Sequence, residues 1–191
     1  MNKEQKSNKM TTLSTATLGG GCYWCTEAVF NRIKGVVKVE SGYSGGTIEN
    51  PTYQQVSTGR TGHVEVIQIT FDPTVITFRE ILEIFFATHD PTTLNRQGND
   101  VGTQYRSVIF YHDQEQRNVA DKMIKELGRS KTCKAPIVTT VEPFTTFYPA
   151  EDYHRNYFKR NPNEGYSRFV IAPKLVKLEK GFLDKLQEYS E

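Results

Sequence analysis

A glycine-rich run that contains two cysteines places the strongest constraint on how this chain can fold. Residues 19–25 are Gly-Gly-Gly-Cys-Tyr-Trp-Cys and follow a short apolar stretch at residues 13–18, which favours a strand. Glycines permit a sharp turn and a close approach of the backbone. Apolar residues then recur at helical spacing until Gly35, so the run predicts a strand, a tight turn and a helix that begins near Cys22.

The two cysteines of this run indicate redox chemistry on sulfur. The free backbone N–H groups and the dipole of a helix that begins at Cys22 would stabilise a thiolate and lower its pKa. Cys25 lies one helical turn later and is a plausible disulfide partner. Tyr23 and Trp24 offer apolar faces to a thioether-like substrate. The structural alternative is two buried cysteines that act as small hydrophobic residues.

Length and composition narrow the class of protein. The chain has 191 residues, enough for one domain that buries a core without disulfides. Three cysteines are a small and odd number for a secreted disulfide framework. A net charge of +2 argues against nucleic-acid binding, and no apolar run is long enough to span a bilayer. Residues 1–12 are polar and basic, which predicts a disordered tail without a signal peptide and a cytoplasmic protein.

Strand and helix patterns follow one another along the rest of the chain. The predicted strands are residues 36–43, 63–71, 105–111 and 137–142. The predicted helices, with Thr77 and Asp113 as N-caps of the first two, are residues 77–88, 113–127, 150–160 and 173–189. We therefore expect an α+β protein: a single two-layer α/β sandwich domain with a ferredoxin-like mixed sheet, long irregular loops and a C-terminal helix. The irregular segments 44–62 and 90–104 are the expected location of a site.

Several motifs in order along the chain resemble the A-type peptide methionine sulfoxide reductases. Residues 21–24, Gly-Cys-Tyr-Trp, resemble that family's Gly-Cys-Phe-Trp signature, with tyrosine in place of the usual phenylalanine. The further matches are Gly-Tyr-Ser-Gly-Gly (42–46), Asn-Pro-Thr-Tyr (50–53), Thr-Gly-His-Val-Glu (61–65), His-Asp-Pro (89–91), Gln-Gly-Asn-Asp (97–100), Gly-Thr-Gln-Tyr-Arg (102–106) and Ala-Glu-Asp-Tyr-His (150–154). Each motif alone is weak, but together they cover most of residues 14–167 and are highly specific.

The resemblance implies an activity and a set of site residues. The activity is reduction of the S epimer of methionine sulfoxide, free or in polypeptides, to methionine, which repairs oxidised protein. The resemblance implies that Cys22 is the nucleophile and that Glu65 is the acid that protonates the sulfoxide oxygen, best with a pKa raised by burial. The other implied roles are hydrogen bonds to the oxygen from Tyr53 and Tyr105, shaping of the pocket by Asp100, and a seat for the methyl group on Tyr23 and Trp24.

Without the resemblance, these side chains would be given structural roles. Glu65 alternates with Val64 and Val66 along its strand and would be placed on the solvent face. The Asp100 side chain would be a turn former, and the two tyrosines would be ordinary amphipathic aromatic residues. The two histidines of the matching motifs, at positions 89 and 154, are interpreted as structural.

The chain departs from much of this family at its second cysteine. Many members have glycine where Cys25 stands and use a resolving cysteine in a C-terminal segment, where this chain has Ser167. The resemblance therefore implies that Cys25 condenses with a Cys22 sulfenic acid, and that thioredoxin or a similar dithiol reduces the resulting disulfide. Cys133 is interpreted as an exposed, incidental thiol, with a relay of the disulfide as the alternative.

The remaining expectations concern domains, partners and competing classes. Residues 13–170 are the expected catalytic domain, and residues 171–191 a C-terminal helical extension. We expect no bound cofactor or metal, no nucleic-acid or membrane partner, and a monomer. Two other classes stay open. One is a thioredoxin-like disulfide oxidoreductase with its Cys-x-x-Cys at a helix start, and the other is a small metal- or peptide-binding module that uses Cys22, Cys25 and a histidine.

Overall fold

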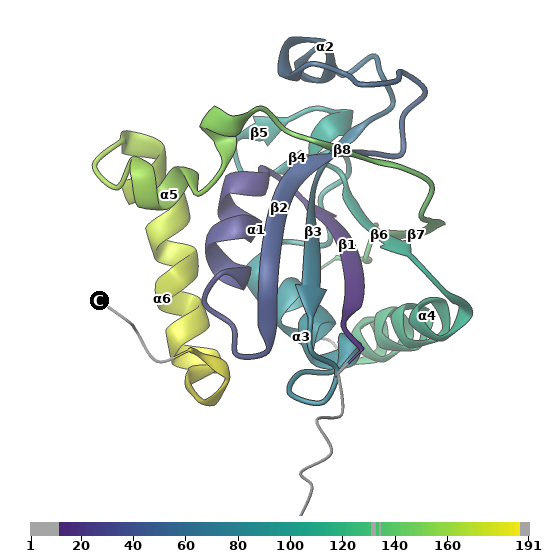
Figure 1. Ribbon diagram of the computed structural model, residues 1–191. Coiled ribbons are helices and arrows are strands. Elements are labelled where there is room, and N and C mark those ends of the chain that lie inside the picture. Colours follow the sequence, from purple (N-terminus) through teal and green to yellow (C-terminus); the bar gives the residue numbers. More distant parts are fainter. Residues whose placement is uncertain (1–11, 131–132, 134, 188–191) are drawn as a thin grey trace, which may run out of the picture.

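The computed structural model describes residues 12–130, 133 and 135–187, which form a six-stranded sheet flanked by helices (Figure 1). The strands lie in the order β7-β6-β1-β3-β2-β8. Their bounds are β1 (Ser14–Gly20), β2 (Val36–Ser44), β3 (Val64–Phe71), β6 (Ser107–Tyr111), β7 (Thr140–Pro143) and β8 (Phe147–Pro149). Neighbouring strands are antiparallel, except that β6 and β7 are parallel. The expected single α+β domain with a mixed sheet is confirmed.

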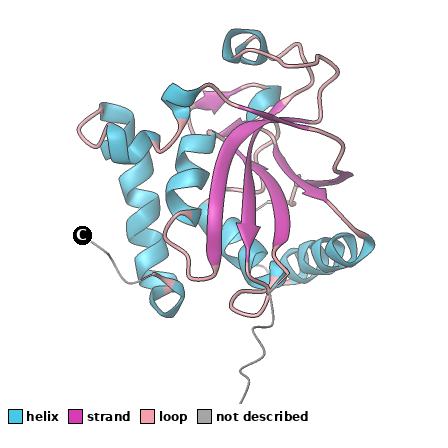
Figure 2. Cartoon of the chain, viewed as in Figure 1, coloured by secondary structure: helices cyan, strands magenta, loops and turns pink. Residues whose placement is uncertain are grey.

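The helices surround this central sheet (Figure 2). They are α1 (Tyr23–Phe30), α2 (Tyr53–Ser57), α3 (Phe78–Thr88), α4 (Gln114–Arg129), α5 (Tyr157–Arg160) and α6 (Ala172–Gly181). The helix α1 contacts β2 and β3 and also packs against α3 and α6. Ile67 and Ile69 of β3 join the main core with these helices, whereas Val64 and Val66 belong to a second buried cluster with Phe144 and other residues. Both faces of this part of β3 are therefore covered.

The two segments expected to be irregular contain short elements. Residues 44–62 hold α2, and residues 90–104 hold a hairpin of β4 (Arg96–Gln97) and β5 (Asp100–Val101). A 3-10 turn at Thr103–Tyr105 follows this hairpin. Tyr105 therefore lies outside the strand that the sequence predicts from that residue, because Gly102, at φ +150, turns the chain before β6.

Three predicted helices differ from the observed elements, and the first two are the helix after Cys22 and residues 150–160. The helix α1 ends at Phe30, and the chain reaches β2 through Gly35, whose φ is +82. Residues 150–160 are not one helix but a 3-10 turn at Asp152–His154 followed by the short α5. The interruption is at Asn156, which has a left-handed φ of +51 and donates its backbone N–H to the Glu27 carboxylate at 3.0 Å. A contact with α1 therefore overrides the local helical spacing.

The C-terminal helix belongs to the same core as the sheet. Leu175 and Leu178 of α6 are buried, and this helix packs against α1 and α3. It ends at Gly181, before a 3-10 turn at Leu183–Lys185, and is thus shorter than the predicted residues 173–189. Residues 1–11 of the predicted tail (1–12) and the last residues, 188–191, lie outside the described residues. Among the residues that are described, no helix has the length and apolar character needed to cross a membrane.

The helix α3 begins after Thr77, the N-cap that the sequence predicts, and Thr77 forms a capping box with Glu80. The Thr77 hydroxyl accepts the backbone N–H of Glu80, and the Glu80 carboxylate accepts that of Thr77. Thr77→Ala leaves one N–H of the first turn without its acceptor, so we expect the free energy of unfolding to fall by about 1 kcal/mol. Urea denaturation followed by circular dichroism measures this change. The control Thr47→Ala, in an exposed loop, should change it by less than about 0.5 kcal/mol, and equal values for the two variants would contradict the prediction.

Candidate active site

The turn between β1 and α1 brings Cys22 against the sheet. Gly21 has φ +90, and a Cβ atom there would lie 2.6 Å from the side chain of Gln97, so the turn requires glycine. A Cβ atom on Gly20 would lie 2.7 Å from the ring of Phe85. Cys22 is the N-cap of α1, which confirms the predicted junction of strand, turn and helix.

Glu65 lies in β3 beneath the start of α1. Alternate residues of a strand face opposite sides, so Glu65 faces away from Val64 and Val66. That side is covered by α1, and the Glu65 side chain is 2% exposed. Its Oε2 accepts the backbone N–H of Tyr23 at 3.2 Å. The solvent-facing position that alternation alone suggests for Glu65 is therefore wrong, because helices cover this face of the sheet.

Burial keeps the Glu65 carboxyl group protonated near neutral pH. Desolvation raises the pKa of Glu65 to about 8, and the hydrogen bond from the Tyr23 N–H offsets part of this effect. The nearby charge of Asp100 raises the pKa of Glu65 further. The raised pKa expected for an acid catalyst is thus present, and Glu65 has a proton to donate at pH 7.

Cys22 does not have the lowered pKa that its position at a helix start suggests. Burial, the hydrogen bond with Cys25 and the charge of Glu65 raise the pKa of the Cys22 thiol. The first N–H group of α1, that of Tyr23, is engaged by Glu65 instead of the sulfur. In the reduced protein Cys22 is consequently a protonated thiol, and the expectation of a resting thiolate is wrong.

The pKa of the second thiol, Cys25, is shifted in the opposite direction. Its hydrogen bond with Cys22 is the largest cause, the charge of Lys174 adds to it, and the pKa of Cys25 is lowered to about 7 despite burial. Cys25 is 1% exposed, and its backbone N–H donates to the Cys22 carbonyl at 3.1 Å. Both are free thiols. Two adjacent thiols with different pKa values suit thiol–disulfide exchange.

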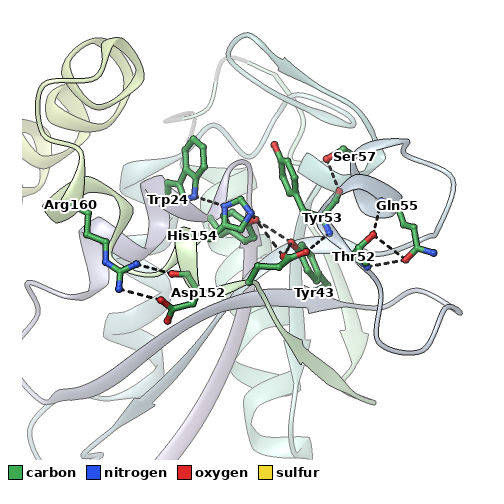
Figure 3. Close-up of polar contacts among 11 residues, drawn as sticks. Trp24, Tyr43, Thr52, Tyr53, Gln55, Ser57, Asp152, His154 and Arg160 are labelled. Carbon is green, nitrogen blue, oxygen red and sulfur yellow. Dashed lines mark hydrogen bonds and ion pairs between the residues drawn. The ribbon is translucent and has the colours of Figure 1, made fainter.

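Trp24 is held by aromatic side chains from the segment that follows β8, and Figure 3 shows one of them, His154. Its Nε1 donates to Nδ1 of His154 at 3.0 Å. Tyr157 stacks on the indole with ring centroids 3.6 Å apart, and Tyr166 meets it edge-on at 5.6 Å. Trp24 remains partly exposed, so it presents a fixed apolar surface to the outside. His154, interpreted from sequence as structural, supports this surface directly.

Tyr23 points into the core. Its side chain is 1% exposed, and its hydroxyl lies 3.2 Å from that of Tyr43, the cross-strand partner of Glu65. Tyr43 in turn donates to the Glu151 carboxylate at 2.9 Å. The resemblance implies that Tyr23 and Trp24 together bind the methyl group of the substrate. Of these two side chains, Trp24 alone is partly exposed.

Tyr53, the first residue of α2, reaches the site from the segment between β2 and β3 (Figure 3). Glu151 accepts its backbone N–H at 2.8 Å, and its ring centroid lies 4.7 Å from that of His154. His63 stabilises the same loop, because its Nδ1 accepts the backbone N–H of Gly46 at 3.1 Å. These contacts bring a residue from a distant loop beside the start of α1.

The β4–β5 hairpin supplies Asp100, and the 3-10 turn after it supplies Tyr105. Asp100 accepts a hydrogen bond from the Tyr166 hydroxyl at 2.6 Å. Burial, together with the charges of Glu65 and Cys22, raises the pKa of the Tyr105 hydroxyl, so this group stays a hydrogen-bond donor. The structure therefore places Asp100 and Tyr105 near the Glu65 carboxyl group, as the sequence analysis expects.

Sequence reasoning does not identify Tyr166, Tyr157 or Glu151. Tyr166 precedes Ser167, the position compared with the family's resolving cysteine, and Glu151 lies in the matching motif at residues 150–154, so each had a signal nearby. Tyr157 has no such signal. Among the described residues, no group of three His, Cys, Asp or Glu side chains could hold a metal ion. Cys133 is partly exposed and free.

Two neighbouring thiols, a protonated buried acid and a fixed aromatic surface define a thiol-based oxidoreductase. A family model described as peptide methionine sulfoxide reductase matches residues 14–186. The chain is 57% identical over 175 residues to the peptide methionine sulfoxide reductase MsrA of Saccharolobus solfataricus, covering 92% of this chain and 98% of the relative.

Solved structures agree with this match. Mxr1 of Saccharomyces cerevisiae in reduced form has a TM-score of 0.72 and 38% identity, over 82% of this chain and 90% of that one. Mxr1 in complex with Trx2 has a TM-score of 0.51 and 28% identity, over 81% and 91% of the two chains. The chain belongs to the MsrA family of peptide methionine sulfoxide reductases, and its reaction is the reduction of peptide-methionine (S)-S-oxide. This assignment replaces the disulfide oxidoreductase and the binding module as classes.

Proposed function

We propose that Cys22 attacks the sulfoxide sulfur while Glu65 protonates the sulfoxide oxygen. The observation that carries this assignment is the buried, protonated carboxyl group of Glu65 beneath the first turn of α1, which begins at Cys22. Protonation of the oxygen makes the sulfur more electrophilic, and it offsets the weak nucleophilicity of a thiol that must lose its proton. The acid and the nucleophile therefore act as a pair.

Five further residues form the substrate pocket in this proposal. Tyr53 and Tyr105 donate hydrogen bonds to the oxygen, on which negative charge grows as the sulfur–oxygen bond breaks. Burial raises the pKa of both hydroxyls, which supports their role as donors. Trp24 seats the methyl group, and Asp100 shapes the pocket. The buried side chain of Tyr23 supports this methyl-binding surface from within the core.

The first step transfers oxygen from the substrate to Cys22. The Cys22 sulfur forms a bond with the sulfoxide sulfur as Glu65 protonates the oxygen. The oxygen then passes to the Cys22 sulfur: a new sulfur–oxygen bond forms there, the sulfur–oxygen bond of the sulfoxide and the transient sulfur–sulfur bond break, and methionine leaves while Cys22 becomes a sulfenic acid. The substrate sulfur is reduced by two electrons and the Cys22 sulfur is oxidised by two. The thiol proton of Cys22 replaces the proton that Glu65 gives to the oxygen, so the step takes up no net proton.

In the second step Cys25 attacks the sulfur of the Cys22 sulfenic acid. A sulfur–sulfur bond forms, the sulfur–oxygen bond breaks, and water leaves. The position of Cys25 one turn along α1, its hydrogen bond with Cys22 and its pKa lowered to about 7 support this role. Cys133 takes no part and is an incidental thiol.

Thioredoxin then reduces the Cys22–Cys25 disulfide. The complex of the yeast relative Mxr1 with Trx2 supports a thioredoxin as the reductant. A cycle that returns to two free thiols at each turnover suits a reducing compartment, which favours the cytoplasm. The substrate is methionine sulfoxide, free or in polypeptides, and one chain supplies every proposed group, so a monomer suffices.

Single-turnover analysis tests this proposal. Reduced protein mixed with excess S epimer, without reductant, should form one equivalent of methionine, lose two thiols and contain a Cys22–Cys25 disulfide on peptide mass mapping. The R epimer should yield no methionine, and thioredoxin should restore repeated turnover. The control Cys133→Ser should behave like the wild type. A disulfide that includes Cys133, or the loss of one thiol only, would overturn the role of Cys25.

A further inference from the structure

Tyr166 connects the second thiol to a carboxylate. Its hydroxyl oxygen lies 3.7 Å from the Sγ of Cys25, and the hydroxyl donates to Oδ2 of Asp100 at 2.6 Å. A tyrosine hydroxyl has one proton, which Asp100 engages here, so the oxygen is an acceptor toward Cys25. The thiol of Cys25, the hydroxyl of Tyr166 and the carboxylate of Asp100 therefore form a continuous chain of hydrogen bonds.

We propose that Tyr166 is a catalytic residue that relays the thiol proton of Cys25 to Asp100 while the disulfide forms. This inference rests on the proposed role of Cys25 as the resolving thiol. Burial raises the pKa of Tyr166, so its hydroxyl does not ionise. It passes a proton by accepting one on its oxygen while it gives its own to the carboxylate.

The relay is needed once Cys22 has been oxidised. In the reduced protein the hydrogen bond with the Cys22 thiol is the largest cause of the lowered pKa of Cys25. This thiol is absent from the sulfenic acid, whereas burial, which raises the pKa of Cys25, remains. The causes that still lower this pKa are smaller than burial, and they are the charge of Lys174 and the hydrogen bond with Tyr166. Because the thiolate is the attacking form, Cys25 must lose its proton by another route at this stage.

The atoms, protons and electrons of this step balance. The Cys25 proton passes through Tyr166 to Asp100, and the thiolate forms a bond with the Cys22 sulfur as the sulfur–oxygen bond breaks. The departing hydroxide takes the proton of Glu65 and leaves as water. The Cys25 sulfur is oxidised by one electron and the Cys22 sulfur is reduced by one. Asp100 is partly exposed, so its proton returns to solvent, and Glu65 takes up one proton from solvent before the next turnover, which leaves no net change in bound protons.

Rapid-mixing single turnovers of Tyr166→Phe test the relay. This variant keeps the ring that meets Trp24 edge-on and removes only the hydroxyl. At pH 7 we expect loss of the second thiol to slow by about 10–100-fold, with methionine formation within about threefold of the wild-type rate. Dimedone should trap the accumulated sulfenic acid on Cys22 as a mass adduct. The control is Tyr111→Phe, which also removes one tyrosine hydroxyl, but at the last residue of β6 (Ser107–Tyr111). This variant should leave both phases unchanged.

The pH dependence separates a relay from a packing role. Without the relay, Cys25 reacts only in its spontaneously ionised form. The rate of disulfide formation in Tyr166→Phe should then rise about tenfold per pH unit until the thiol is ionised, and approach the wild-type rate at alkaline pH. The wild-type rate should depend less on pH over this range. A defect in packing would slow both phases at every pH, and that result would overturn the proposal.

Cys25→Ser distinguishes failure of the relay from failure of the resolving role. If Cys25→Ser accumulates sulfenic acid but Tyr166→Phe forms its disulfide at the wild-type rate, the relay is wrong and the resolving role stands. If Cys25→Ser still loses two thiols, Cys25 is not the resolving thiol, and the relay is wrong with it.

Discussion

Serine in place of Cys22 will abolish methionine formation, whereas serine in place of Cys25 will leave one turnover per molecule. A serine hydroxyl cannot accept the sulfoxide oxygen as a stable sulfenic acid, so we expect Cys22→Ser to lose on the order of 10⁴-fold or more in rate. Cys25→Ser keeps the nucleophile and Glu65, and stops with Cys22 oxidised. Methionine counted against thiols lost, in a single turnover without reductant, measures both outcomes.

This pair of variants also decides which thiol attacks the substrate. Cys25 has the lower pKa in the reduced protein, but Cys22 lies at the N-cap of α1, where Glu65 holds the first N–H of the helix. Position beside the acid therefore outweighs the lower pKa in our assignment. Circular dichroism should show that both variants fold, and Cys133→Ser is the matched control. Methionine release by Cys22→Ser would reverse the assigned roles.

Glu65→Gln will lower the rate constant for methionine formation by about 10²–10⁴-fold. Glutamine has nearly the same shape and keeps an oxygen for the Tyr23 N–H, but it has no acidic proton to donate. The pKa of Glu65 is about 8, so the wild-type rate constant should fall as the pH rises through about 8 and the acid ionises. The variant should show no such fall. Single turnovers across this range measure both effects.

The same substitution should change how stability depends on pH. The pKa of Glu65 is raised from 4.5 to about 8 by burial, so the folded state binds this proton more tightly than the unfolded state. This contribution is fully present below about pH 4.5, declines as the pH rises and is lost above about pH 8. Glu65→Gln should lack the decline, as measured by urea denaturation.

The matched control for these measurements is Glu40→Gln, which also removes a carboxylate from the sheet. Glu40 lies in β2, pairs with Lys38 at 2.9 Å, and is more exposed than Glu65. It should keep the wild-type rate constant and both wild-type pH profiles. A fall in rate through about pH 8 that persists in Glu65→Gln would contradict the role of Glu65 as the acid.

Local patterns predict those elements whose bounds depend on neighbouring residues. The alternation at residues 63–71 corresponds to β3 at Val64–Phe71, and the N-cap at Thr77 corresponds to the start of α3 at Phe78. The prediction is wrong where a contact with a residue distant in sequence overrides the local pattern. Residues 150–160 have helical spacing, but the carboxylate of Glu27 engages the backbone of Asn156 and interrupts the helix.

The sequence by itself determined the thiol pair and the family. Gly21, with φ +90, and the N-cap at Cys22 belong to one short run, and local geometry is enough to place the two cysteines one turn apart at a helix start. The order of the motifs is likewise contained in the chain. These features depend on residues close in sequence, so they are predictable without a tertiary structure.

Only the tertiary structure decided the chemical state of the site. Tyr23 and Glu65 are 42 positions apart, and Tyr166 and Asp100 are 66 positions apart, so their hydrogen bonds exist only once the layers have packed. Desolvation by that packing keeps Glu65 protonated and raises the pKa of Cys22 instead of lowering it. A pKa follows the burial and charges around a group, and those are set by distant parts of the chain.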